Sequence, residues 1–142
     1  MSIHVSFTPS GTPYHHSYLY DLESFFWLIL WSVAAHRDED SQHISSKAQH
    51  ILDSMGTGTL ETIAAIKQSR LQDCAMRGGS TMEKTLQLCK NTWASDPIFT
   101  KVILGLGTLF HQVDVWEIPR DEPATSMFPR VVNIIMDALN IA

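Results

Sequence analysis

Three histidines recur at intervals of seven residues, at His36, His43 and His50. Imidazole is the commonest metal ligand in proteins, so the repeat raises the question of a metal site. Zinc ligands on one helix lie three or four residues apart, whereas seven residues make two turns, or about 10 Å. The adjacent pair His15 and His16 point in different directions in most backbones. We therefore expect surface histidines and no metal site.

The two cysteines, Cys74 and Cys89, could serve as nucleophiles or form a disulfide. Neither has a histidine close by in the sequence to act as its general base. Two thiols in an acidic chain of this size also do not make the dense cysteine framework of small secreted domains. We expect two reduced, half-buried thiols in a cytosolic protein.

Gly78, Gly79 and Ser80 precede a predicted helix, and a glycine-rich segment at a helix N-terminus can hold an anion. The segment lacks the lysine and the spacing of a phosphate-binding loop. Ser80 and Glu83 have instead the spacing of a capping box, in which each side chain bonds the backbone N–H of the other residue. We expect a turn followed by a helix cap.

The composition is that of one folded domain. The chain has 142 residues, of which 44% are hydrophobic and 18% charged, which is enough to bury a single core. The net charge is −5, and no run of Lys or Arg reaches three residues, so we expect neither nucleic acid nor an anionic membrane as a partner. Residues 1–16 lack the pattern of a signal peptide. The most apolar segment, residues 25–35, is shorter than the roughly 20 residues that span a bilayer. We expect a soluble, intracellular protein, cytoplasmic or nuclear.

The strongest predicted element is a helix over residues 19–36. Nearly every position from Leu22 to Ala35 is apolar, which is too long for a typical strand. Asp21 is a suitable N-cap. Because the segment is apolar on every side, we expect it to be buried on every side, at the centre of the fold.

Further helices follow from apolar residues at helical spacing and from caps. We predict them over Ser41–Met55, over Thr59–Ala75, from the Ser80 cap onward, over Pro97–His111 behind an Asp96 N-cap, and from Pro129 to the end. Residues 112–128 are predicted to form an irregular acidic loop anchored by Trp116. Residues 1–17 read as an irregular N-terminal segment in which Ile3, Val5 and Phe7 favour at most a short edge strand. The remainder, residues 18–142, is predicted to form a single all-α domain.

The segment from His16 to Trp31, His-Ser-Tyr-Leu-Tyr-Asp-Leu-Glu-Ser-Phe-Phe-Trp-Leu-Ile-Leu-Trp, resembles a segment of fungal-type protein kinases. In that family the pattern is roughly His-x-Tyr-x-His-Asp-Leu-Glu-Ser-Phe-Phe-x-x-Leu-x-Trp. Tyr20 stands where family members usually have His. Residues 64–71, which include Lys67, resemble a later Ala/Lys/Leu segment of the same family. The family motif residues carried over are Asp21, Leu22, Glu23, Ser24, Phe25, Phe26 and Trp31.

The resemblance implies a helical bundle like the C-terminal lobe of a protein kinase, with about six helices around one central apolar helix. The complete family domain uses ATP and Mg to phosphorylate protein Ser or Thr, but the nucleotide-binding lobe, its strand lysine and the catalytic and magnesium-binding Asp have no counterpart here. Phosphoryl transfer depends on those groups. We therefore expect no cofactor and no kinase activity from this chain.

His36, Arg37 and Asp38 also resemble the catalytic-loop signature of protein kinases, in which the Asp accepts the substrate hydroxyl proton. The magnesium-binding Asn should follow five residues later, where this chain has His43. No Asp-Phe-Gly motif follows. We expect a solvated connector between two helices and predict no catalytic residue.

The leading hypothesis is a catalytically incomplete kinase C-lobe that acts as a pseudokinase-like interaction module or is a gene fragment. Such a lobe should expose apolar surface that binds a protein partner. In the family, the Asp at the position of Asp21 holds the catalytic loop, so here it either caps its own helix near the surface or is held by residues 1–17 or another chain. One alternative is that the chain is part of a split or misannotated active kinase. A second is an unrelated small helical binding protein, which a peripheral position of the apolar helix would favour.

Overall fold

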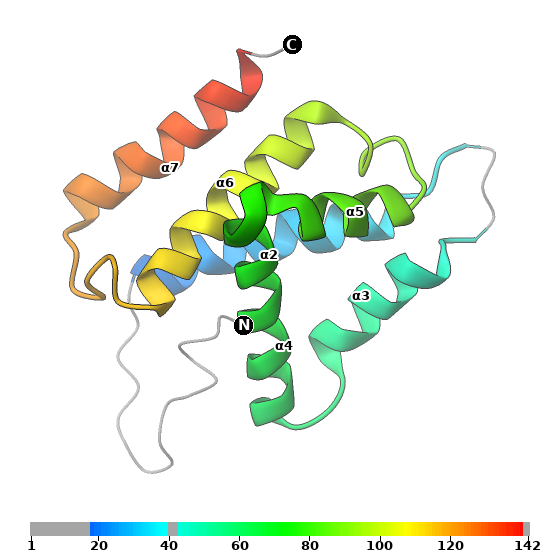
Figure 1. Ribbon diagram of the computed structural model, residues 1–142, viewed down its shortest axis with the longest axis horizontal. Helices are drawn as coiled ribbons and strands as arrows, with labels where there is room; N and C mark the ends of the chain where they lie inside the picture. Colours follow the sequence, from blue (N-terminus) through cyan, green and yellow to red (C-terminus); the bar gives the residue numbers. More distant parts are fainter. Residues whose placement is uncertain (1–17, 40–42, 141–142) are drawn as a thin grey trace.

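The computed structural model describes residues 18–39 and 43–140, and these residues are helical with no strand. The elements are α2 (Tyr18–Ala35), α3 (Ser46–Gly56), α4 (Leu60–Ala75), the 3-10 helix η1 (Met76–Gly79), α5 (Ser80–Leu88), α6 (Pro97–Asp114) and α7 (Ala124–Leu139). The predicted all-α class is confirmed (Figure 1). The edge strand predicted around Val5 lies outside the described residues. None of the described helices is long and apolar enough to cross a membrane.

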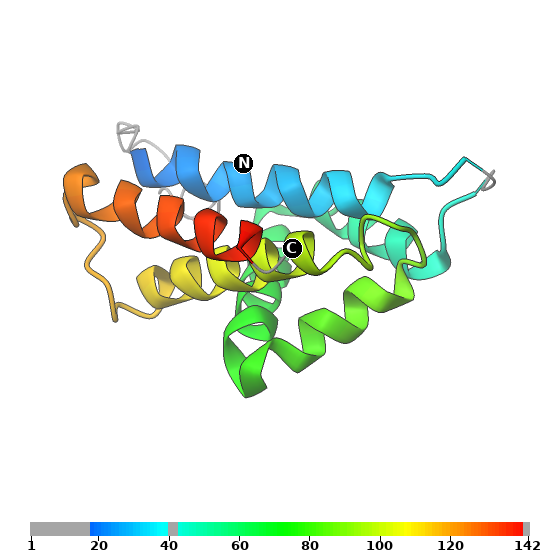
Figure 2. The same cartoon turned by 90° about the horizontal axis from the view of Figure 1, so that it is seen from above.

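The prediction that the most apolar helix lies at the centre is wrong. Helix α6 is the central element, because it packs against α2, α4, α5 and α7. Helix α2 packs mainly against α3 and α6 and lies along one edge of the molecule in Figure 2. Helix α7 runs back alongside α6, and α4 packs across α6 (Figure 1). One face of α2 is therefore left without a covering helix among the described residues.

Two glycines allow the close packing around α6. A Cβ at Gly107 would lie 2.4 Å from Cys74 Sγ on α4, and a Cβ at Gly105 would lie 2.5 Å from a methyl of Ile134 on α7. Glycine lowers the stability of a helix interior. Here each glycine leaves room for a side chain of a neighbouring helix, so each has a packing reason.

Helix boundaries agree with prediction where a cap is strong. Thr59 caps α4 by accepting from the Thr62 N–H, and Asp96 Oδ1 caps α6 by accepting from the Ile98 N–H at 2.7 Å. The Asp21 prediction is wrong, since α2 begins at Tyr18 and places Asp21 in its first turn, where a carboxylate still complements the helix dipole. Asp21 is exposed.

Three other boundary predictions are wrong. The capping box is absent, because Gly79, in the left-handed conformation with φ 79°, precedes α5 and Ser80 is already helical. Helix α3 begins at Ser46 behind an N-cap at Ser45, because the Ser45 hydroxyl accepts from the Ala48 N–H. Helix α7 begins at Ala124 and includes Pro129.

The loop between α6 and α7 also differs from expectation. Trp116 is 65% exposed, whereas Ile118 is 5% exposed and anchors the loop in the core. The Arg120 guanidinium lies over the Trp116 ring at 4.3 Å. Trp116 therefore covers a surface cation and does not serve as the predicted anchor.

Candidate functional site

The family motif residues are divided between the two faces of α2. Phe26 and Glu23 are fully buried, and Leu22 and Ser24 are half-buried. Asp21, Phe25 and Trp31 lie on the opposite, exposed face. The motif therefore does not form one site: its inner residues belong to the core and its outer residues to the surface.

Glu23 is the motif residue with the most unusual environment, since a fully buried carboxylate is rare in proteins. It accepts a hydrogen bond from the indole N–H of Trp27 at 3.2 Å. The Lys67 ammonium, itself buried, lies 5.2 Å from the centre of the Trp27 ring. Burial lowers the pKa of Lys67, and the Glu23 carboxylate opposes that shift. The two segments that resemble the kinase family thus meet in the fold at this charged cluster.

The sequence did not predict this cluster, because Asp21 matched the family motif as the residue with a functional role. The available signal was a single acidic residue inside an apolar run, four residues before a tryptophan that can donate to it. A second buried cation, Arg70, lies about one turn after Lys67 and donates to the Ser54 hydroxyl at 3.1 Å. Both cations fasten α4 to its neighbours, so their position indicates a structural role.

The outer face of α2 carries a row of large apolar side chains. Phe25, Leu28 and Trp31 are 43%, 60% and 48% exposed. They recur every three residues and so form one ridge along the helix, which we call the α2 ridge. The prediction that α2 is buried on every side is wrong, because no described helix covers this ridge. Apolar ridges of this kind mark binding surfaces in folded proteins.

The His36–Asp38 segment is a connector held by side-chain contacts to the loop before α6. The Asp38 carboxylate accepts hydrogen bonds from the Thr92 N–H and the Thr92 hydroxyl, the latter at 2.7 Å. These bonds hold the pKa of Asp38 below its ordinary value. His36 stacks on Trp93 with ring centroids 3.9 Å apart and contacts Asp38 at 3.3 Å. Asp38 therefore holds the loop before α6 against the end of α2.

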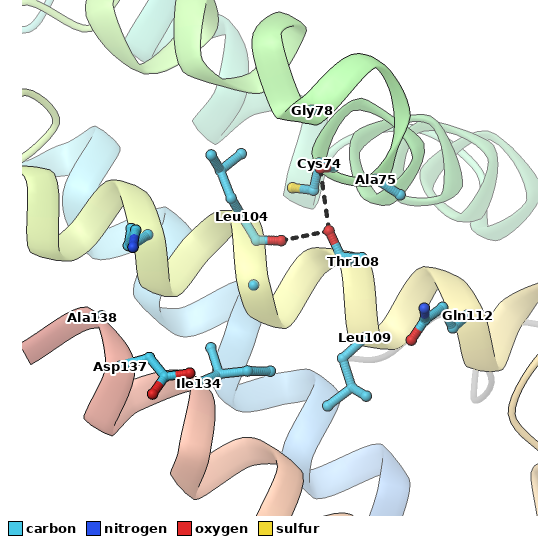
Figure 3. A pocket seen from close by; sticks show the side chains of 12 residues that line it. Cys74, Ala75, Gly78, Leu104, Thr108, Leu109, Gln112, Ile134, Asp137 and Ala138 are labelled. Carbon is cyan, nitrogen blue, oxygen red and sulfur yellow. Dashed lines mark hydrogen bonds between the residues drawn. The ribbon is translucent and has the colours of Figure 1, made fainter.

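An apolar pocket of about 520 Å³ lies between α6, α7 and the end of α4 (Figure 3). Its volume is within the range of small-molecule sites. The Thr108 hydroxyl, which could serve as a polar group, is bonded to the carbonyls of Leu104 and Cys74 (Figure 3). Burial raises the pKa of the Cys74 thiol, which also lines the pocket, to about 12. A thiol with that pKa is protonated at neutral pH and is a poor nucleophile.

The remaining candidates for chemistry are not brought together. Cys74 and Cys89 are both free thiols and are fully buried, more than the half-burial expected. Within the described residues, no three His, Cys, Asp or Glu side chains are grouped so that they could hold a metal ion. His43 and His50 are exposed, and His36 is engaged with Trp93.

Comparisons with protein-family models, curated proteins and solved structures found no match. The relation to fungal-type protein kinases therefore remains a prediction that rests on residues 16–31 and 64–71. The α2 ridge is one apolar surface that the described residues leave exposed.

Proposed function

We propose that this chain is a helical protein-interaction module that binds a partner helix on the α2 ridge and does not transfer phosphate. The observation that carries the proposal is the exposure of Phe25, Leu28 and Trp31 in one row on a helix whose opposite face is buried. Tryptophan and other aromatic side chains at the centre of an apolar patch supply most of the binding energy in many interfaces.

The spacing of the ridge favours a helix as the binding partner. Side chains three residues apart form a ridge that fits the groove between rows of a second helix. Two serines beside the ridge support an apolar partner face. The Ser24 hydroxyl donates to the Tyr20 carbonyl and the Ser32 hydroxyl to the Leu28 carbonyl, each at 2.8 Å. Because both hydroxyl protons are already bonded within α2, an apolar helix can approach without leaving a donor unpaired.

Descent from a fungal-type kinase C-lobe is a further part of the proposal. The meeting of Glu23 and Lys67, one from each segment that resembles the family, supports it. The edge position of α2 supports the alternative of an unrelated helical binding protein (Figure 2). Both hypotheses assign a binding function to the α2 ridge and neither assigns catalysis. Tight binding of Mg-ATP by the full chain, seen as a raised melting temperature in a thermal-shift titration, would contradict both hypotheses.

Photo-crosslinking from the ridge tests the binding function. We would place p-benzoylphenylalanine at position 28 in the full chain in its native cells and identify the crosslinked peptide by mass spectrometry. The matched control is position 60, because Leu60 is 56% exposed and lies on α4, away from the ridge. We expect an amphipathic helical segment of another protein at position 28 only. Equal adducts at both positions, or a second copy of this chain at position 28, would contradict the proposal.

A further inference from the structure

A second pocket, of about 550 Å³, is lined by residues at the start of α3 and the end of α5. These two helix ends lie at the right of Figure 1. The pocket is distinct from the α2 ridge and from the apolar pocket of Figure 3. We call it the α3–α5 basic pocket. Its lining residues are Ser45, Ser46, Lys47, His50, Leu88 and Lys90.

The pocket is formed by a direct bond between the two helices. The Ser45 hydroxyl donates to the Leu88 carbonyl at 2.9 Å, and the same oxygen accepts from the Ala48 N–H to cap α3. Lys90 then turns in the left-handed conformation, with φ 56°. This geometry fixes Lys90 beside the first turn of α3, which carries Lys47. Two lysines far apart in the sequence therefore share one concave surface.

The charge of this pocket has a sign opposite to that of the chain. The net charge is −5, yet the lining contains two lysines and a histidine and no Asp or Glu. Within the described residues, no carboxylate lies within ion-pair distance of Lys47, His50 or Lys90. Burial raises the pKa of Asp73 on α4, and the charges of Arg70 and Lys47 oppose that shift. The pocket thus holds cations that the described part of the fold leaves unneutralised.

We infer that the α3–α5 basic pocket binds a phosphate monoester dianion. Two ammonium groups match the charge of the dianion, and the His50 imidazole N–H adds a third donor. The Ser46 hydroxyl, which also lines the pocket, adds a neutral donor. The volume leaves room for a small organic group beyond the phosphate, which the Leu88 side chain can contact. With only two lysines, the pocket is too small a basic surface for nucleic acid.

The test is a titration of the full chain in which NMR monitors the backbone amides. The probes are inorganic phosphate, sulfate, glycerol 3-phosphate and N-acetyl-phosphoserine amide. We expect the largest shifts at residues 45–50 and 88–90. Replacing both lysines, as Lys47→Gln with Lys90→Gln, should weaken binding about tenfold or more, whereas Lys84→Gln on the exposed face of α5 should leave it unchanged. The charge-preserving pair Lys47→Arg with Lys90→Arg should retain binding, which separates lost charge from lost folding.

The tighter of the two monoesters identifies the source of the ligand, a small metabolite or a phosphorylated side chain. The inference is overturned if neither monoester binds, if the shifts lie elsewhere, or if sulfate binds as tightly as both monoesters. It is also overturned if the Lys47→Gln, Lys90→Gln variant keeps its affinity while folded.

Discussion

The Trp27 indole donates its N–H to the Glu23 carboxylate one turn earlier on α2, at 3.2 Å, and both side chains are buried. Both residues lie on the inner, buried face of the helix. The inner face carries a charged cluster completed by Lys67 of α4, while the outer face carries the α2 ridge. Substitutions on the two faces should therefore have different effects, on folding and on binding respectively.

Removing the buried carboxylate should destabilise the fold. In a Glu23→Ala variant the Lys67 ammonium stays buried without the carboxylate that favours its charge, so we expect a loss of about 3 kcal/mol in the free energy of unfolding. Urea denaturation followed by circular dichroism measures it. The double variant Glu23→Gln with Lys67→Met removes both charges and should recover most of the loss. A Glu23→Ala variant as stable as the wild type would show that the cluster does not hold α2 to α4.

The three glycines 107, 105 and 56 should respond to alanine in that order. Gly107→Ala places a methyl against Cys74 at the α4–α6 contact and should destabilise by about 2 kcal/mol or more. Gly105→Ala meets one atom at short range, the Cγ2 methyl of the half-buried Ile134 at 2.5 Å, whereas Gly107→Ala meets both Sγ and Cβ of the buried Cys74, so the effect at Gly105 should be smaller. Gly56→Ala meets nothing within 4 Å and should stabilise α3 by up to about 1 kcal/mol. Denaturation midpoints that reverse this order would contradict the packing around α6.

Acid should release the connector after α2. The pKa of Asp38 lies below its ordinary value of 3.8, mainly because it accepts hydrogen bonds from Thr92. A carboxylate with a lowered folded-state pKa stabilises the fold above its unfolded pKa, and this contribution disappears as pH falls through the folded value. Carbon-detected NMR of the Asp38 carboxyl should give a midpoint below 3.8. Thr92→Val should raise that midpoint, and an unchanged midpoint would show that Thr92 is not the cause.

The two thiols should be inert in the folded protein. Burial raises the pKa of Cys74 to about 12 and also raises that of Cys89. Iodoacetamide at pH 8 should therefore alkylate neither residue until urea unfolds the chain, which mass spectrometry can follow. Rapid alkylation of native Cys74 would instead indicate that the apolar pocket opens to solvent.

The helices with strong caps could be predicted from the sequence, but the way in which the helices pack against one another could not. Thr59 and Asp96 define helix starts through local bonds, so the boundaries of α4 and α6 could be predicted. The exposed face of α2 could not be, because an apolar run without polar residues on one side gives no sign of which side faces solvent. The side of α2 that faces solvent depends on which other helices pack against α2.

The candidate sites depend on residues that are distant in the sequence. Tertiary packing brings Glu23 near Lys67 and places Lys47 and Lys90 on the lining of one pocket. Patterns within a few residues could not predict either pair. The His36–Asp38 segment could be recognised locally by its resemblance to a catalytic loop. Its hydrogen bond to Thr92, however, could not be predicted from that local pattern.

The central claim is that the α2 ridge binds a partner helix, and the most direct measurement is calorimetry with the purified segment that crosslinks to position 28. We predict that Trp31→Ala weakens its binding at least about tenfold, because an exposed tryptophan within an apolar row is a typical hot spot. The same substitution should change the unfolding free energy by no more than about 0.5 kcal/mol. Leu60→Ala should bind as the wild type does. Equal affinity of wild type and Trp31→Ala would contradict the claim.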